Sequence, residues 1–318
     1  MKDHGHTRHP RDSSRVHRLR HARQEGCLRI AASFVLYAGA TLAADQVGGV
    51  LWIPAWLLCG FLLSGAFSAL HYGSHGTLFV GRRANRWAAT ALGLPVLLNS
   101  SLYRSFHLEH HRKTNVSGDT EPGGGVPSLG RYLFYCLNWD FIFGFMRLST
   151  RSIFGRPPYF VNTESARTAV RVDAVLLLVW LGAVATAAAV WPRQTLLFYL
   201  LPLQGAWTMN FLLSLPEHYE CDERDDGYAN TRSTSVRNPF VRWFLWGSNY
   251  HAEHHLDPAM PFPELTAFHR DIQHHLKFKS DSYARFHLRL VKSLAARSRR
   301  PTAPPGPGRF ASFEYPSA

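Results

Sequence analysis

Eighteen histidines occur in this sequence, and many of them stand in short clusters with helical spacing. HYGSH contains one pair, the pattern HxEHH occurs twice, as HLEHH and HAEHH, and LPEHY contains a single histidine. Residues three and four apart lie on one face of a helix, and neutral imidazole is a common metal ligand. The clusters therefore predict a metal site built from His71, His75, His107, His110, His111, His218, His251, His254 and His255.

The number of imidazoles limits the kind of metal site. Nine histidines are too many for one four-coordinate zinc, and they suit two metals with four or five nitrogen ligands each. Imidazole accepts zinc, copper, iron and nickel alike, and the zinc-protease signatures HExxH and HxxEH are absent from the sequence. We favour a pair of redox-active irons, since a site at a membrane surface could oxidise an aliphatic chain.

Four apolar blocks must position these clusters, at residues 28–45, 50–70, 174–191 and 195–215. Each is close to the length of about 20 residues that a helix needs to cross a bilayer. The short connections DQVGG and WPRQ predict two helical hairpins. We expect an all-α integral membrane protein with four transmembrane helices and a cytosolic helical cap that holds a di-metal site. Buried helices of a soluble bundle are the alternative.

Two further stretches are apolar but interrupted. Residues 87–103 contain Gly93, Pro95 and Asn99, which indicates a re-entrant or interfacial segment. Residues 132–148 mix aromatic side chains with arginine, which is typical of an interfacial helix.

The distribution of charge predicts the orientation. The net charge is +13, and basic residues gather in the N-terminal segment, the loop 71–173 and the C-terminal third, whereas the last connection between spans offers only Arg193. Positive loops face the cytoplasm, so we expect both termini and the site on the cytoplasmic side, against anionic lipid. No nucleic-acid-binding motif accompanies the charge, so no nucleic acid is expected as a partner.

Three regions follow from the composition. Residues 1–27 are basic and polar without a secretory signal, and we expect a disordered tail whose histidines (His4, His6, His9, His17 and His21) are not ligands. Residues 28–297 form the membrane domain, and residues 298–318 are expected to form a second disordered tail. The four cysteines are scattered without a CxxC pair, which favours reduced thiols.

The histidine motifs, together with the phrases FHLEHHRKTNVSGDTEP and NTRSTSVRNPFVRWFLWGSNYHAEHHLDPAMPF, resemble the membrane fatty acid desaturase superfamily. The resemblance implies four spans, a cytosolic cap and two irons, with the nine histidines above as ligands. His218 matches the extra histidine that many members place after the last span. The acyl-CoA desaturases have an asparagine one helical turn earlier, where this chain has Ser214, which leaves one ligand position open.

The resemblance also implies an activity. We expect an O₂-dependent oxidoreductase that desaturates a fatty acyl or lipid-like chain, with a hydroxylase or ketolase on the same scaffold as the alternative. A membrane metal-binding or transport protein is an alternative of a different class. The chain has neither an HPGG haem motif nor a cysteine cluster, so electrons must come from an external ferredoxin or cytochrome with its reductase.

Charged residues beside the clusters could assist. Carboxylates that could orient the imidazoles, or only face solvent, are Glu109, Glu217, Glu253, Asp119 and Asp257. Basic residues that could hold an anionic head group or an acidic electron donor, or only reflect the charge of a cytoplasmic loop, are Arg82, Arg83, Arg104, Arg112 and Lys113.

Overall fold

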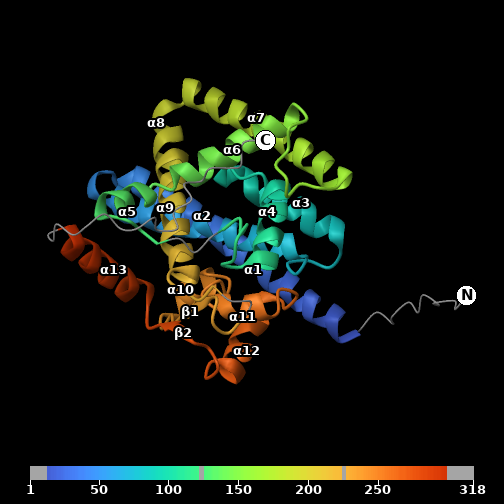
Figure 1. The fold of residues 1–318 in the computed structure, drawn as a ribbon. Helices are drawn as coiled ribbons and strands as arrows, with labels where there is room; N and C mark the ends of the chain where they lie inside the picture. Colours follow the sequence, from blue (N-terminus) through green and yellow to red (C-terminus); the bar gives the residue numbers. More distant parts are fainter. Residues whose placement is uncertain (1–12, 122–124, 224–226, 299–318) are drawn as a thin grey trace, which may run out of the picture.

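The computed structural model describes residues 13–121, 125–223 and 227–298, and these residues are mostly helical (Figure 1). The helices are α1 (Ser13–Val47), α2 (Trp52–His75), α3 (Arg82–Gly93), α4 (Ser100–Lys113), α5 (Leu129–Tyr135), α6 (Trp139–Ile153), α7 (Glu164–Val190), α8 (Pro192–Thr195), α9 (Leu201–His218), α10 (Pro239–Phe244), α11 (His251–Leu256), α12 (Leu265–Ile272) and α13 (Tyr283–Ser298). Short 3₁₀ turns form at η1 (Gly49–Leu51), η2 (Leu94–Val96) and η4 (Phe262–Glu264), and a π-helical turn, η3 (Leu196–Leu200), leads into α9.

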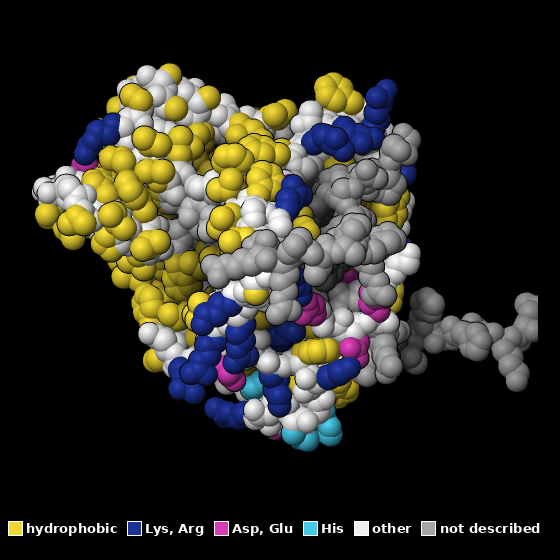
Figure 2. Space-filling model, turned by 60° about the vertical axis from the view of Figure 1, so that its left-hand side comes forward, with side chains coloured by type: hydrophobic (Ala, Val, Ile, Leu, Met, Phe, Trp, Pro, Cys, Tyr) yellow, Lys and Arg dark blue, Asp and Glu magenta, His cyan; other side chains and the backbone are white. Residues whose placement is uncertain are grey.

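Four helical stretches are long and apolar enough to cross a membrane, which confirms four candidate spans. They are Ser14–Val47, Gly49–His75, Glu164–Val190 and Pro192–His218. Large apolar side chains such as Phe34, Leu57 and Val179 are more than half exposed on them. Figure 2 shows hydrophobic side chains gathered over one part of the surface and lysines and arginines largely elsewhere. Such a contiguous apolar surface is what lipid would cover.

The connections between consecutive spans lie together at one end of the molecule. Asp45 at the end of α1 forms an ion pair of 2.9 Å with Arg193 in α8. Close by, the Tyr37 hydroxyl donates to the Phe198 carbonyl at 2.6 Å. Deeper between the helices, a Cβ on Gly60 would lie 3.0 Å from the Cα of Gly205, so α2 and α9 approach with backbones almost in contact. From α8 onward, α7 and α9 diverge (Figure 1).

A buried carboxylate ties the third span to the preceding helices. Asp173 of α7 is 1% exposed and accepts hydrogen bonds from Thr90 of α3 at 3.1 Å and from Ser100 of α4 at 2.9 Å. It also pairs with Arg86 at 3.2 Å. A buried charge is tolerated when it is paired and hydrogen-bonded, and here the pairing fixes α4 against α7. The main apolar core, with Phe106, Phe145, Trp207 and their neighbours, fills the space beside this network.

The expectation of a disordered segment at residues 1–27 is wrong for its described part, because α1 begins at Ser13. Tertiary packing orders this basic stretch. Ala22 is fully buried in a cluster with Leu78 and Trp246, and a Cβ on Gly26 would lie 3.1 Å from Leu78. His17 and His21 are exposed on α1. His4, His6 and His9, and the expected second tail beyond residue 298, lie outside the described residues.

Two other local expectations need correction. Residues 132–148 form two helices rather than one, because α5 ends before Asn138, whose positive φ of 57° interrupts the helix. An all-α fold is also incomplete as a description, because β1 (Arg232–Thr234) pairs in parallel with β2 (Phe278–Ser280). Residues 87–103 run from α3 through η2 into α4, and their depth in a bilayer stays a prediction.

Candidate metal centre

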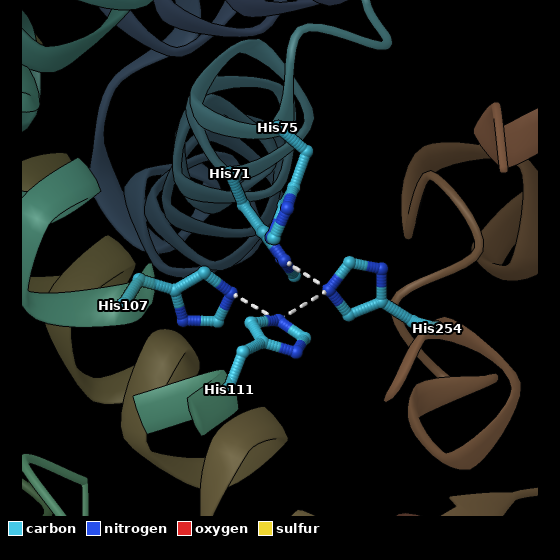
Figure 3. A group of neighbouring side chains, drawn as sticks. All are labelled: His71, His75, His107, His111 and His254. Atoms are coloured by element: carbon cyan, nitrogen blue, oxygen red, sulfur yellow. Dashed lines mark hydrogen bonds between the residues drawn. The ribbon is translucent and has the colours of Figure 1, made fainter. Parts of the chain in front are cut away.

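The structure brings the nine predicted histidines into two adjacent groups. The first contains His71, His75, His107, His111 and His254 (Figure 3), and the second contains His110, His218, His251 and His255. Within each group, one ring nitrogen from every residue lies within 4.8 Å of those of the others. The groups adjoin, because the rings of His111 and His255 stack with centroids 4.2 Å apart.

Each of the two short helices divides its rings between the groups. α4 gives His107 and His111, one turn apart, to the first group and directs His110 to the second. α11 does the reverse, giving His251 and His255 to the second group and His254 to the first. The two HxEHH motifs therefore interlock, each supplying two rings to one group and one ring to the other. The end of α2 completes the first group and the end of α9 completes the second.

Pairs of Nε2 atoms lie at hydrogen-bonding distance in both groups. In the first group, the Nε2 atom of His254 lies 2.8 Å from that of His71 and 3.0 Å from that of His111. In the second, the Nε2 atom of His218 lies 3.1 Å from that of His110 and 2.8 Å from that of His251. A hydrogen bond across such a pair needs a proton on one of the two nitrogens.

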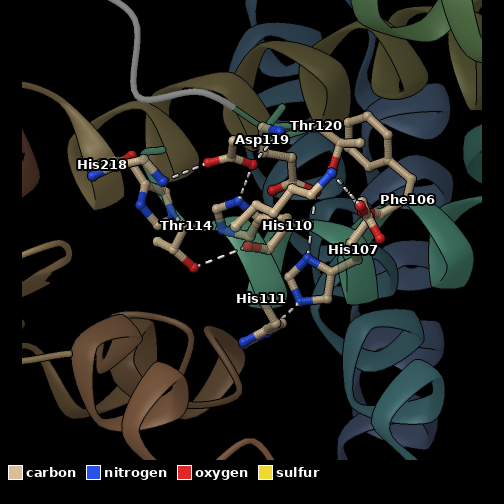
Figure 4. A network of polar contacts seen from close by, with 12 residues as sticks. Phe106, His107, His110, His111, Thr114, Asp119, Thr120 and His218 are labelled. Carbon is tan, nitrogen blue, oxygen red and sulfur yellow. Dashed lines mark hydrogen bonds and ion pairs between the residues drawn. The ribbon is translucent and has the colours of Figure 1, made fainter. Parts of the chain in front are cut away.

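The outer ring nitrogens show where the protons are. The Nδ1 atom of His110 faces Asp119 Oδ1 at 2.7 Å, and that of His218 faces the Asn230 carbonyl at 3.4 Å, so both Nδ1 atoms must be donors (Figure 4). The neutral tautomers then leave unprotonated Nε2 atoms facing each other. A cation between these lone pairs would remove their repulsion.

Unpartnered nitrogens support the same conclusion. The Nε2 atoms of His75 and His255 are buried and have no hydrogen-bond partner within residues 13–121, 125–223 and 227–298. Burial, followed by the charge of neighbouring imidazoles, holds the pKa of His107, His254 and His255 well below the usual value for histidine. These rings are therefore neutral near pH 7, the form that binds metal. The donor set fits two first-row transition metals, since each group presents only nitrogen atoms.

Outer partners orient several of the rings. His107 Nδ1 lies 3.3 Å from Glu121 and His251 Nδ1 lies 3.5 Å from Glu217. His255 Nδ1 faces the Thr114 hydroxyl at 3.3 Å. Although burial lowers the pKa of His110, the carboxylates of Glu121 and Asp119 outweigh that effect and raise it. Bonds of this kind fix both the tautomer and the direction of a ligating imidazole.

The predicted carboxylates divide into two sets. Asp119 and Glu217 reach histidines of the second group, as proposed from the sequence. Glu109 instead pairs with Arg112 and Lys113. The others also point elsewhere, since Glu253 bonds Ser233 and His269, and Asp257 accepts from the Ala259 amide. Sequence reasoning missed Glu121, because a loop position fourteen residues after His107 has no periodic relation to it.

The remaining sequence candidates lie outside both groups. Ser214 is exposed, and its hydroxyl donates to the Phe211 carbonyl of its own helix at 3.4 Å. Arg104 donates from Nε to the Ser74 carbonyl at 2.9 Å, which ties α4 to the end of α2. Arg82 and Arg83 are exposed at the start of α3, and a role for them in binding a head group or a donor stays a prediction.

A histidine outside the clusters supports the end of α9. Pro216 lacks an amide proton, so the Leu212 carbonyl one turn earlier has no helical partner. His287 Nε2 of α13 donates to that carbonyl at 2.7 Å, and its Nδ1 accepts from the Tyr132 hydroxyl at 3.0 Å. On the other side, Arg232 donates to the Pro216 carbonyl at 2.7 Å. These bonds fix the turn that carries His218.

Replacing His287 with phenylalanine is therefore expected to lower the free energy of unfolding by about 1–3 kcal/mol, the cost of leaving buried polar groups unpaired. Thermal unfolding in detergent measures the change. His287→Gln should recover part of it, because its amide can donate to the Leu212 carbonyl. The exposed His274→Phe is the matched control, and an equal loss in both phenylalanine variants would contradict the assignment.

Asp119→Asn tests the outer partners of the site. Asp119 accepts from His110 through one oxygen, and from the Asn115 amide at 2.7 Å through the other. An asparagine can keep only one oxygen acceptor, so His110 loses its fixed tautomer or the loop loses its anchor. We expect a 10–100-fold weaker metal affinity, measured by competition with a chelator. Asp281→Asn, at an exposed ion pair, should leave the affinity unchanged.

Comparison with known proteins identifies the family. The family model described as fatty acid desaturase matches residues 50–287, which contain all nine histidines. The chain belongs to the fatty acid desaturase family. Membership places it among oxidoreductases of desaturase or hydroxylase type. The first candidate span, Ser14–Val47, lies before the matched region.

The names of the curated relatives of this chain refer to different substrates. It is 26% identical over 244 residues to a sphingolipid delta(4)-desaturase/C4-monooxygenase of Rattus norvegicus, an alignment that covers 69% of this chain and 66% of the relative. It is 25% identical over 256 residues to a dihydrorhizobitoxine desaturase of Bradyrhizobium elkanii, covering 74% of this chain and 72% of the relative. It is also similar to the delta(5) fatty acid desaturase fat-4 of Caenorhabditis elegans, 25% identical over 244 residues, covering 66% of this chain and 54% of the relative.

Proposed function

We propose that this protein is an O₂-dependent di-iron desaturase of a fatty acyl or lipid-like chain, with the nine histidines as metal ligands. The observation that carries the proposal is the pair of adjacent all-histidine groups, of five and four residues, in a member of the desaturase family. When bound, two irons would supply the reduction of O₂ that oxidises the substrate. Two hydrogens from neighbouring carbons, two electrons from a donor and two protons together reduce O₂ to two waters.

The residues of the chain hold the site in place and keep water away. Asp119 and Glu121 keep the Nδ1 protons of His110 and His107, which leaves the Nε2 lone pairs free. Aromatic rings cover the first group, since Tyr72 stacks on His71 and Tyr103 stacks on His107, each at 5.3 Å. A dry and rigid surround favours the oxidation of a C–H bond over side reactions.

The proposed membrane arrangement has two hairpins, α1–α2 and α7–α9, with the cap on the cytoplasmic side. The ion pair between Asp45 and Arg193 joins the two connections at one end. His71 and His218 end their spans at the other, beside the cap that carries α11. We place both termini and the site in the cytoplasm because the N-terminal segment, the loop 71–173 and the C-terminal third are basic, and positively charged segments face the cytoplasm. The electron donor would be a ferredoxin or cytochrome with its reductase.

A hydroxylase is the second candidate on the same scaffold. The name desaturase/C4-monooxygenase of a relative favours it, because it pairs both outcomes in one enzyme. A ketolase would need the same site. Because several relatives are named sphingolipid desaturases, a sphingoid chain is among the candidate substrates. A metal-transport role has less support. Asp173, an acidic residue inside the third span, is buried in hydrogen bonds rather than facing an ion path.

Expression with an electron donor, followed by mass spectrometry of the total lipids, tests the function. We expect a lipid that has lost two hydrogens and consumption of O₂ by protein that holds two irons. A product that has gained one oxygen would establish the hydroxylase. Protein that binds metal but neither consumes O₂ nor changes any lipid would overturn the proposal.

A further inference from the structure

A second site lies away from the two histidine groups, where α1, α10 and η4 enclose a pocket of about 270 Å³. Its walls include Arg29 and Arg242, the aromatic residues Trp243, Tyr250 and Phe262, and Thr266. This volume is below the roughly 300–1,000 Å³ of pockets that enclose a whole drug-sized ligand. The pocket therefore suits a small polar group attached to a larger molecule that stays outside.

Arg29 is a buried cation with spare hydrogen-bonding capacity. The residue is 8% exposed, and its guanidinium lies 4.6 Å from the ring centroid of Phe262 and 5.2 Å from that of Trp243. Nη1 donates to the Trp243 carbonyl at 2.7 Å. Nε faces Glu25 at 3.5 Å, and is buried without a hydrogen-bond partner among the described residues. Buried donors of this kind are unfavourable unless something accepts from them.

The pocket carries an excess of positive charge. Its lining residues include two arginines and no carboxylate. The neighbouring carboxylate of Glu25 is shared between Arg29 and the indole N–H of Trp243, which it accepts at 3.3 Å. Glu264 at the end of η4 pairs with Arg18 at 3.6 Å instead. An anion is therefore the chemical class that the pocket favours, and two guanidinium groups favour phosphate in particular.

The surroundings of the pocket indicate a lipid. Leu28, next to Arg29, is 56% exposed, and Phe240 on α10 is 46% exposed. Further along α1, Phe34 and Val35 are exposed by 74% and 67%, on a helix apolar enough to span the membrane. The pocket thus lies where α1 changes from its basic first turns to its apolar length. Lipid head groups occupy that level of a membrane, and arginine is favoured there.

We propose that this pocket binds the phosphate of an anionic phospholipid, between Arg29 and Arg242, while the acyl chains lie against the exposed apolar side chains of α1 and α10. The bound lipid would join α1 to the segment that leads into the third histidine cluster, since Tyr250 precedes His251 directly. The proposal depends on the membrane location of the chain and does not depend on the identity of the metal or the substrate.

Native mass spectrometry of the full chain in detergent tests the proposal. The chain is titrated with phosphatidylglycerol, with phosphatidylcholine, or with inorganic phosphate at the same concentration. Arg242→Gln is the test variant, because Arg242 is exposed and can be changed without disturbing the core. Arg156→Gln, an exposed arginine in the connection between α6 and α7, is the matched control for general charge.

We expect the wild type and Arg156→Gln to retain phosphatidylglycerol in preference to phosphatidylcholine. Arg242→Gln should bind it about tenfold more weakly, the factor that corresponds to the loss of one charge-assisted hydrogen bond. Equal retention of both lipids, or equal losses in the two variants, would overturn the proposal. Displacement of the lipid by an equal concentration of inorganic phosphate would overturn the lipid as ligand, and would identify a site for free phosphate.

Discussion

Replacing His254 with alanine is expected to abolish activity and to empty the five-histidine group of its metal. His254 is 1% exposed, and its Nε2 atom lies 2.8 Å from that of His71 and 3.0 Å from that of His111. It is the contribution of α11 to the first group, where it meets rings from α2 and α4 (Figure 3). Alanine removes a nitrogen ligand and leaves a space that water enters.

The expected loss of product formation is more than about 100-fold, since even an outer partner of a ligand is worth 10–100-fold. Iron analysis and product analysis of the same preparation measure both effects. The exposed His274→Ala should keep full activity and full iron content. A His254→Ala variant with wild-type iron and wild-type turnover would show that the first group is not the metal site.

Removing the metal from the wild-type protein is the second large effect that we expect. Without a cation, the Nε2 atoms of His110 and His218 would face each other at 3.1 Å with no metal to share. A metal that binds only the folded state stabilises it by about 2.7 kcal/mol at a hundredfold excess over its dissociation constant. For a chain of this size that stabilisation corresponds to an apparent melting temperature about 4 °C higher.

Dialysis against a chelator of ferrous iron, followed by thermal unfolding and an O₂ uptake assay, measures these changes. Activity should vanish with the iron and return when ferrous iron is added back. Zinc added to the same apo protein should restore the melting temperature without activity, because zinc has no redox chemistry. Restored turnover with zinc alone would contradict a redox role for the metal.

Much of the site could be predicted because its signals are local. The spacing of His71 and His75, and the repeated HxEHH pattern, specify one helix face each, and the structure has a helix at all three places. The lengths of the apolar blocks predicted the candidate spans in the same way, although the first helix begins 14 residues and the third 10 residues before its block. Local periodicity is sufficient for both, because a helix repeats every 3.6 residues wherever it lies.

Structural features that depend on residues far away in the sequence could not be predicted. The basic segment from Ser13 to Cys27 is helical only in the context of the residues that bury Ala22 and Gly26. Glu121 reaches His107 through a loop, and His287 reaches Leu212 across two helices that are far apart in the sequence. Each of these contacts depends on how distant helices and loops pack together. The residues next to each partner in the sequence carry no information about that packing.

Local spacing in the chain was enough to predict that the imidazole rings stand in sets, on helices at the ends of the apolar spans or between them. How those sets divide between the two groups depends on the three-dimensional packing of the helices. His110 shares a helix face with His107 and His111 yet belongs to the other group, and His254 is separated from His251 and His255 in the same way. The reason is that α4 and α11 meet at an angle and a depth set by the packing of the surrounding helices, and that geometry assigns each ring to its group.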